Sequence, residues 1–292
     1  YNSYVMKAGD KIILFETAKA KFFDEYLEKL KEVIDVTKID YLVVSHTEPD
    51  HAGSVERLLD YSPQMKILAT GCAIGFLKEI VNRDFVSIAV KDEQKMTIGN
   101  RTLRFLFVPN LHWPDTMYTF IEEEQILVTC DSFGAHYCLP EVVSTEIQSE
   151  EDYQKALKYY YDCIIGPFKP FMLKALDRVE DMDITMVCTG HGPVLVGDRI
   201  KAVMKQYREW STVVNPNEKK TVVMPYVSAY GYTKMLAEKI AEGIRDSGDI
   251  DVRMYDMVEA DAAKVSEELL FADGILLGTP TIVGEALKPI WD

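Results

Sequence analysis

One hexapeptide constrains the fold more than any other part of this 292-residue chain: His46-Thr47-Glu48-Pro49-Asp50-His51. It follows directly on Tyr41-Leu42-Val43-Val44, a continuous apolar run typical of a strand that is buried on both faces. Imidazoles and carboxylates crowded into one loop repel or compete with each other unless a cation holds them. The hexapeptide therefore predicts a metal site at the carboxyl end of a sheet strand.

Three further polar residues end apolar runs in the same way. They are His112 after 105–108, Asp131 after 126–130 and His191 beyond 184–188. A single histidine in such a place is more often a hydrogen-bonded structural residue than a ligand. Four of the five histidines belong to the combined set, however, and His136, which lacks a partner pattern, is interpreted as structural. The recurrence indicates one site built on one rim of a sheet.

The combined set contains four imidazoles and three carboxylates. The candidate ligands are His46, Glu48, Asp50, His51, His112, Asp131 and His191. Seven ligands exceed what one tetrahedral zinc ion can use, so two metal ions are predicted. The share of carboxylates favours iron or manganese. Asp131 lies between the two groups in the chain and is the natural candidate for a bridging ligand.

Up to about residue 212 the chain mixes hairpins with helices. Strands are predicted at 4–6, 12–15, 41–44, just before Lys91, at 96–98 and 103–107 around the turn Gly99-Asn100, at 117–121 and 125–130, and at 184–188. Helices are predicted at 21–34, 54–61, after Gly71, at 151–164, 168–179 and 199–210, and residues 45–53 are predicted to be a loop. The pattern indicates sheets flanked by helices.

A polar, proline-broken stretch at 213–220 predicts a domain boundary, with domains at 1–214 and 215–292. Beyond it, strands at 221–227, 251–255 and 274–277 alternate with helices at 232–245 and 259–270, which predicts a parallel sheet with right-handed crossovers. The chain begins with Tyr1 rather than Met, and residues 287–292 stop where a helix should start. We therefore expect a fragment of a longer chain.

Composition excludes several classes of protein. A formal charge of −15 argues against non-specific nucleic-acid binding, which needs a basic face. No apolar run approaches the roughly twenty residues of a membrane helix, and the start lacks a signal-peptide pattern. The five cysteines form no C-x-x-C pair, which argues against a disulfide framework or a rubredoxin-type cluster and predicts that all five pack as small apolar residues. A cytoplasmic protein is expected.

The ligand pattern resembles the metallo-β-lactamase fold, whose hydrolases carry H-x-H-x-D-H in the first loop. This chain has H-x-E-x-D-H, with Glu48 at the second histidine position, followed by a flavodoxin-like domain. In both respects it resembles the flavodiiron proteins, or A-type flavoproteins. The resemblance implies one iron on His46, Glu48 and His112, a second on Asp50, His51 and His191, and Asp131 as the bridge.

The fold class that the resemblance implies is α+β followed by α/β. A metallo-β-lactamase-like αββα sandwich that lacks the family's first strands would precede a C-terminally truncated, doubly wound flavodoxin-like sheet. Two loops of the second domain resemble FMN loops; their residues are Ser228, Ala229, Tyr230, Gly231, Tyr232 and Thr233, and Thr279, Pro280, Thr281 and Ile282. The hydroxyls of the first loop could equally well cap a helix.

The resemblance also implies an activity: reduction of dioxygen to water, of nitric oxide to nitrous oxide, or of both, at two irons supplied with electrons through FMN. It implies a head-to-tail homodimer and an electron donor such as rubredoxin or a fused reductase domain. One alternative is a binuclear zinc hydrolase, which expects histidine at position 48 and leaves the second domain without a role. Another is a non-enzymatic electron carrier with a structural metal, although structural sites are closed by four ligands.

Overall fold

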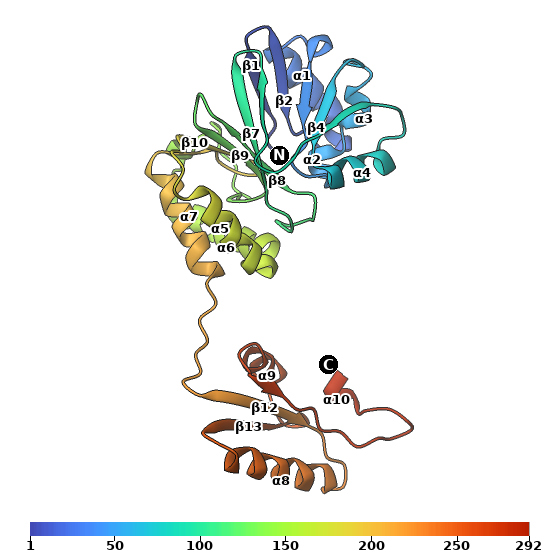
Figure 1. Cartoon of the computed structure of the whole chain (residues 1–292), viewed down its shortest axis with the longest axis vertical. Helices are drawn as coiled ribbons and strands as arrows, with labels where there is room; N and C mark the ends of the chain where they lie inside the picture. Colours follow the sequence, from blue (N-terminus) through green and yellow to red (C-terminus); the bar gives the residue numbers. More distant parts are fainter. Residues whose placement is uncertain (292) are drawn as a thin grey trace. The chain divides into compact units, whose positions relative to one another are not determined.

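The computed structural model describes residues 1–291, which divide into two compact units. The first unit is Tyr1–Thr212, and the second begins at Val213 (Figure 1). Each unit has its own sheets and its own buried core.

The first unit contains a five-stranded sheet. In spatial as well as chain order its strands are β1 (Tyr4–Ala8), β2 (Lys11–Phe15), β3 (Tyr41–Val43), β4 (Lys66–Ala69) and β5 (Val86–Ala89). β1 and β2 form an antiparallel hairpin, and the other neighbours pair in parallel. Parallel neighbours need crossover connections. These are the helices α1 (Phe23–Val33), α2 (Pro49–Ala52), α3 (Val55–Leu58) and α4 (Gly71–Ile80), with 3-10 turns at Ala20–Phe22 and Val36–Lys38.

A six-stranded sheet forms the other half of this unit, in the order β11-β10-β9-β8-β7-β6. Its strands are β6 (Lys95–Ile98), β7 (Arg101–Phe107), β8 (Met117–Ile121), β9 (Ile126–Cys130), β10 (Met186–Thr189) and β11 (Leu195–Val196). Only β9 and β10 pair in parallel. The associated helices are α5 (Glu150–Tyr160), continued by a π turn at Tyr161–Ile165, α6 (Lys169–Val179) and α7 (Asp198–Ser211), with 3-10 turns at Ser144–Glu146 and Gly166–Phe168.

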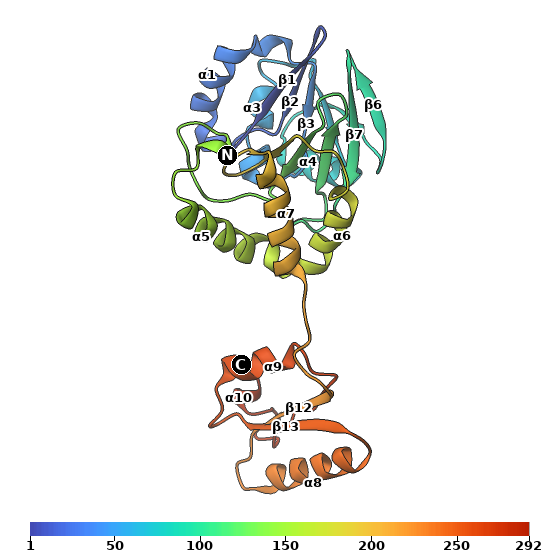
Figure 2. The same ribbon diagram turned by 90° about the vertical axis from the view of Figure 1, so that its left-hand side faces the viewer.

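Apolar side chains fill the layers between these elements. α1, α3 and α4 bury Leu27, Leu58 and Leu77 against the first sheet. α5, α6 and α7 pack on the second sheet, and both views show these three helices grouped together (Figures 1 and 2). Side chains of both sheets, among them Phe15 and Phe105, meet in a core of their own. The helix–sheet–sheet–helix order confirms the predicted αββα sandwich.

The strand directions bring several strand ends to one edge. β7 and β9 are both antiparallel to β8, so they run the same way, and β10 is parallel to β9. Their carboxyl ends therefore share an edge. The first sheet reaches this edge through β3, because the N–H of Met117, at the start of β8, donates to the carbonyl of Ser45 over 3.0 Å. The ends of β3, β7, β9 and β10 consequently meet.

The second unit is a three-stranded parallel sheet in the order β13-β12-β14. Its elements are β12 (Lys220–Tyr226), α8 (Tyr232–Asp246), β13 (Ile250–Asp256), α9 (Ala262–Leu269), β14 (Gly274–Ile275) and α10 (Lys288–Trp291). Met224, Tyr226 and Val252 of the strands pack with Ala237 and Ala241 of α8. The alternation and the parallel strands confirm the predicted flavodoxin-like sheet.

Some local predictions fail. The apolar pattern does not predict β4 or β11. The two residues of β11 are too few to show a period, and β4 is a short buried apolar run, which periodicity alone cannot tell from a helix segment. The loop predicted at 45–53 is wrong in part, since it contains α2, in which Pro49 occupies the first turn, where no N–H is needed. β14 ends at Ile275 rather than at 277, although the N–H groups of Leu276 and Gly278 still donate to β12 carbonyls over 3.1 and 3.0 Å.

The cysteine prediction is wrong for three of the five residues. Cys130 and Cys188 are buried at the ends of β9 and β10, as expected for small apolar side chains. Cys72, Cys138 and Cys163 are exposed. Cys72 lies in the first turn of α4, Cys138 in a loop and Cys163 in the π turn after α5, and spacing along the chain does not show which face of such an element meets the core. No helix within residues 1–291 is long and apolar enough to cross a membrane.

Gly99 allows a destabilising substitution with a matched control. Its φ is +58°, and a Cβ atom there would overlap the backbone carbonyl of Ala8. We expect Gly99→Ala to lower the free energy of unfolding by roughly 2–4 kcal/mol through backbone strain and steric overlap. Gly75→Ala should be neutral or stabilising by about 1 kcal/mol, because that site is helical and open. Urea unfolding of both variants measures the difference, and equal midpoints would contradict the prediction.

Candidate metal centre

All seven candidate ligands lie at the shared edge of the two sheets. They are His46 and Glu48 in the segment after β3, Asp50 and His51 in α2, His112 between β7 and β8, Asp131 directly after β9, and His191 shortly after β10. The side chains of His46, His51 and Asp131 are almost completely buried. The short helix α2 matters because it turns Asp50 and His51 toward the same edge that Glu48 reaches from its N-cap position.

The first group of ligand atoms surrounds one carboxylate oxygen of Glu48. Glu48 Oε2 lies 3.3 Å from His46 Nε2 and 2.9 Å from His112 Nε2. Asp131 Oδ2 approaches the same two nitrogens, at 3.6 and 3.4 Å. Two ligands about 2.1 Å from one ion, at right angles, lie about 3 Å apart. These four side chains are therefore spaced as ligands of one ion.

A second group lies on the other side of Asp131. Asp131 Oδ1 is 3.0 Å from His51 Nε2 and 3.1 Å from His191 Nε2. Asp50 approaches the same nitrogens, with its Oδ1 3.7 Å from His51 and its Oδ2 3.4 Å from His191. Each oxygen of Asp131 thus faces a different pair of histidines. This arrangement has the form of two metal positions that share one carboxylate.

Opposite charges dominate the electrostatics. Burial would raise the pKa of Asp131, but the neighbouring imidazoles of His51, His112 and His191 hold it well below its usual range. Hydrogen bonds from His112 and His46 lower the pKa of Glu48 to about 2. Burial opposes protonation of His46, yet its hydrogen bonds to Asp115 and Glu48 raise its pKa to about 10. The carboxylates are therefore ionised and ready to bind cations.

The donor set fits a pair of metal ions. Asp131 Oδ2 and Asp50 Oδ1 are buried, and among residues 1–291 neither has a hydrogen-bond partner. A buried carboxylate oxygen without a partner is costly unless a cation satisfies it. Imidazole nitrogens mixed with carboxylates suit iron, manganese or zinc, and seven donors exceed one coordination sphere. Iron fits this set of ligands.

Comparisons with known proteins agree with this geometry. Residues 1–192 match the family described as ODP family beta lactamase. The whole chain is 42% identical to Flavo-diiron protein FprA2 of Clostridium acetobutylicum and covers 74% of it. Diflavin flavoprotein A 1 of Synechocystis sp. is 40% identical over 98% of this chain, which spans about half (49%) of that relative. Rubredoxin oxygen:oxidoreductase from Desulfovibrio gigas superposes with a TM-score of 0.69 at 28% identity, covering 100% of this chain and 72% of that one.

The chain belongs to the flavodiiron protein family. The structure brings the seven sequence-predicted ligands of this flavodiiron chain together. His46, Glu48 and His112 form one group, Asp50, His51 and His191 form the other, and Asp131 is placed between them. Their role as ligands stays a prediction, which metal analysis of variants can test.

Asp115 is a residue that the sequence reasoning missed. Its carboxylate is buried behind His46 and accepts from His46 Nδ1 over 3.2 Å. It also accepts from the N–H and hydroxyl of Thr47, over 2.8 and 2.7 Å. Burial would raise the pKa of Asp115, but these bonds hold it below its ordinary value. Asp115 therefore orients His46 with its Nε2 toward the metal position, as carboxylates commonly do for metal-binding histidines.

Glu16 has a comparable place behind His51. It follows β2, is almost fully buried and has a φ of +58°. One oxygen accepts from the N–H of Ser45 over 2.8 Å, while the other has no partner within residues 1–291. A carboxylate oxygen of Glu16, a ring nitrogen of His51 and the Cys130 sulfur lie within 4.8 Å of one another. Burial raises the pKa of Glu16 to about 7, although His51 and Ser45 oppose the rise.

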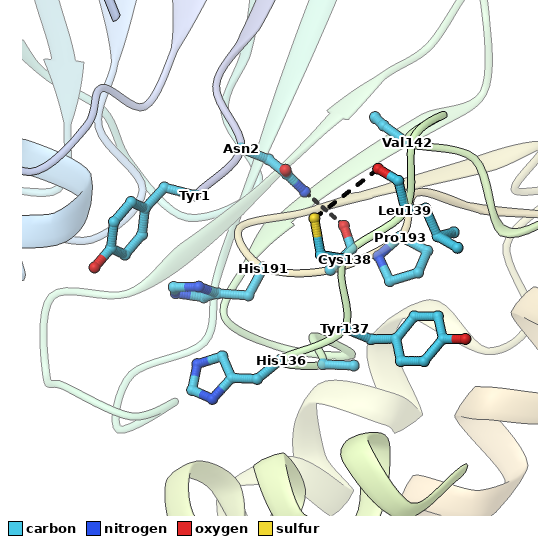
Figure 3. A pocket seen from close by; sticks show the side chains of 11 residues that line it. Tyr1, Asn2, His136, Tyr137, Cys138, Leu139, Val142, His191 and Pro193 are labelled. Carbon is cyan, nitrogen blue, oxygen red and sulfur yellow. Dashed lines mark hydrogen bonds between the residues drawn. The ribbon is translucent and has the colours of Figure 1, made fainter. Parts of the chain in front are cut away.

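His136 is closer to the centre than its sequence context indicates. Its ring centroid lies 5.5 Å from that of His191 and 4.9 Å from that of Tyr160. A cavity of about 290 Å³ opens beside this pair and is lined also by Cys138. Figure 3 shows the rings of His136 and His191 pointing to the same side of it. Tyr160 also donates its hydroxyl to Asp131 Oδ1 over 3.2 Å.

The predicted FMN residues lie beyond the carboxyl ends of β12 and β14 in the second unit, in two loops and in the first turn of α8. Gly231, with a φ of +85°, precedes α8, and the hydroxyl of Ser228 accepts from the N–H of Lys234 over 3.2 Å. The loops are neighbours, because the N–H of Val227 donates to the carbonyl of Gly278 over 2.8 Å. The N-terminus of a 15-residue helix beside hydroxyl side chains suits a phosphate. These residues therefore fit part of an FMN site, including Ala229, Tyr230, Tyr232, Thr233, Thr279, Pro280, Thr281 and Ile282.

Asp115 should control metal affinity through His46. We expect Asp115→Asn, which keeps the size and removes the charge, to weaken binding of at least one metal ion by about 10–100-fold. The control is Asp60→Asn, an exposed carboxylate that pairs with Arg83. Metal retained per chain after dialysis against graded chelator measures the effect. Equal retention by both variants would show that the bond from His46 to Asp115 has no influence on the metal.

Metal uptake should release protons and strengthen as pH rises. In protein stripped by a chelator, burial opposes protonation of His112 and His191. Hydrogen bonds to Asp131 and Glu48 nevertheless raise the pKa of His112 to about 9, and bonds to Asp131 and Asp50 do the same for His191. The pKa of His46 is about 10. Metals bind neutral imidazole, so at pH 7 these rings must lose protons, and apparent affinity should increase until pH passes about 9–10. Calorimetry in buffers of different ionisation enthalpy counts the protons. Binding without proton release at pH 7 would contradict these pKa directions.

Proposed function

We propose that this flavodiiron chain is an oxidoreductase that reduces dioxygen to water, nitric oxide to nitrous oxide, or both, with electrons passed through FMN to a di-iron site. The observation that carries the proposal is the position of Asp131, whose two oxygens face one histidine pair each at 3.0–3.6 Å. A hydrolase could use the same scaffold. Glu48 in place of a third histidine in the first loop supports iron instead, because it makes the donor set richer in oxygen.

Bound iron would supply open coordination positions and reversible one-electron chemistry for a small neutral substrate. The protein side chains hold and shield that position. Asp115 orients His46 through its 3.2 Å hydrogen bond. The Trp113 ring meets His46 edge-on at 5.0 Å, and the Phe168 ring lies 6.3 Å from that of His112. These rings place apolar surface beside His46 and His112, which suits a neutral diatomic substrate better than an ionic one.

Electron delivery through FMN is supported by the names of the relatives and by the two loops of the second unit. The proposed contacts are the backbone and hydroxyls of 228–233 for the phosphate and residues 279–282 for the ring system. FMN would supply electrons in pairs or singly to the metal site. For the donor we propose a small carrier such as rubredoxin, because the relative from Desulfovibrio gigas bears that carrier in its name. A fused reductase domain is the alternative donor.

A head-to-tail homodimer is also part of the proposal. Its support is the family resemblance, in which the flavin of one chain serves the metal site of the other. Sedimentation analysis of the protein, with and without FMN, measures the oligomeric state. A monomer with full activity would contradict the proposed homodimer but not the proposed reaction.

The experiment that tests the function starts with metal analysis of protein purified without oxygen. About two irons per chain, as two ions sharing these ligands require, together with consumption of dioxygen or nitric oxide in the presence of a chemical reductant and FMN, would support the proposal. Zinc alone after growth in iron-supplemented medium, with hydrolase activity and no reductase activity, would replace it by the binuclear zinc hydrolase. Iron without either reductase activity would indicate an electron carrier.

Asp131 should be needed for both metals. We expect Asp131→Asn to reduce bound metal from about two ions per chain to one or none, because a neutral amide cannot bridge two cations as a carboxylate does. His136→Asn is the control, since His136 lies beside His191 but belongs to neither ligand group. Plasma mass spectrometry of the two variants measures the loss. Full metal content in the Asp131 variant would contradict the bridging role.

A further inference from the structure

A run of oxidisable aromatic side chains leads from the metal site to the end of α7. It begins at Tyr160, whose hydroxyl donates to Asp131 over 3.2 Å. The Tyr160 ring packs against Gly134, where an added Cβ would lie 3.1 Å from a ring carbon. The hydroxyl of Tyr207 donates to the carbonyl of the same Gly134 over 3.3 Å. The side chains of Tyr160 and Tyr207 therefore both contact Gly134, which lies between them.

Beyond Tyr207 the rings are in direct contact. The centroids of Tyr161 and Tyr207 lie 5.0 Å apart, and that of Trp210 lies 5.1 Å from Tyr161 and 5.7 Å from Tyr207. Tyr160, Tyr161 and Tyr207 are almost completely buried, whereas Trp210 is only partly buried. The run thus connects a buried centre with solvent. Electron transfer between side chains falls steeply with distance, so contacts of this kind are the favourable steps.

Among the residues that the structure describes, the hydroxyls of these three tyrosines have hydrogen-bond partners, unlike those of two other buried tyrosines in the same core. A phenol that loses an electron also loses its proton, so it needs an acceptor. Tyr160 has Asp131, Tyr207 has the carbonyl of Gly134, and Tyr161 has the hydroxyl of Ser211 at 2.8 Å. Tyr118 and Tyr153 are equally buried in this core, but their hydroxyls have no partner within residues 1–291. Packing in the core would not by itself require that the hydroxyls of Tyr160, Tyr161 and Tyr207 have hydrogen-bond partners.

We propose that Tyr160, Tyr207, Tyr161 and Trp210 form an electron path that carries oxidising equivalents from the metal site to the protein surface. The inference rests on the proposed function, because a site that reduces dioxygen meets hydrogen peroxide whenever reduction stops after two electrons. The path then provides the missing electrons from the protein. This transfer protects the metal ligands from oxidation. It also gives the chain a second activity, the reduction of hydrogen peroxide.

The step balances with hydrogen peroxide as the oxidant. One hydrogen peroxide and two phenolic O–H groups give two waters and two phenoxyl radicals. The O–O bond breaks, peroxide gains two electrons, and each phenol loses one electron and one proton, which end in water. Each phenoxyl radical then takes up one electron and one proton to become a phenol again, and the electron comes through the path from Trp210. Trp210 in turn takes an electron and a proton from a thiol or ascorbate in solution.

The test uses the iron-loaded full chain, mixed with hydrogen peroxide without dioxygen or reductant. We expect an organic radical in rapid-freeze electron paramagnetic resonance and oxygenated Trp210 in peptide mass spectrometry. In Trp210→Phe that product is lost, and oxidation moves to Tyr160, Tyr161, Tyr207 and the histidines. In the Tyr161→Phe, Tyr207→Phe double variant, oxidation of Trp210 falls several-fold although Trp210 is present. Circular dichroism verifies folding, and the single Tyr161→Phe and Tyr207→Phe variants replace the double variant if it is unstable.

Two controls make the outcome decisive. Tyr153→Phe removes a buried phenol outside the path and should change neither the radical nor its products. Zinc-loaded protein should give no radical, because zinc has no redox chemistry. Oxidation of Trp210 that persists in the double variant or with zinc would mean direct attack from solution and overturn the proposal. So would an unchanged product pattern in Trp210→Phe.

The same measurements separate this inference from the proposed function. A chain that reduces dioxygen or nitric oxide but shows no path-dependent oxidation has the proposed activity and lacks the path. A chain with neither reductase activity but with Trp210 oxidation that depends on Tyr161 and Tyr207 has the path, and its main reaction must be another one.

Discussion

The ionised side chain of Asp131 is the interaction on which the rest of the first unit depends. It is buried at the end of β9, and each of its oxygens faces two histidine nitrogens. A buried carboxylate is tolerated only where positive charge or hydrogen bonds surround it. The backbone is shaped to provide this surrounding. A Cβ at Gly190 would lie 2.7 Å from the ring of His51, so only glycine lets the end of β10 bring His191 to its place.

Much of this centre can be predicted from sequence because each ligand follows an apolar run. Carboxyl ends of strands that run the same way share an edge, so polar residues at those ends, such as Asp131 and His191, meet in space. Glu16 carries the same signal, since it directly follows β2, but the sequence analysis does not include it. Asp115 carries no such signal. Its importance comes from a bond to His46, 69 residues away, which no local pattern encodes.

What the sequence pattern does not contain is the relation between elements. The apolar runs predict most strands, but they do not show that β3 belongs to one sheet and β9 to the other, or that the link from Met117 to Ser45 joins their ends. Short elements are missed for a related reason. α2 has four residues and forms because Pro49 suits a first helical turn, and because the segment closes on the metal ligands, not because of an apolar period.

The two halves of the centre match in ligand type but differ behind their histidines. His46 donates to Asp115, a carboxylate whose pKa lies below its ordinary range, so a full negative charge stands behind that ring. His51 has Glu16 nearby, and burial raises the pKa of that carboxyl to about 7. A charged acceptor makes an imidazole a stronger donor to its metal. Two ions in these positions would therefore differ in electron density even with identical ligands. Asp115 and Glu16, which lie behind the histidines and outside the seven candidate ligands, would set that difference.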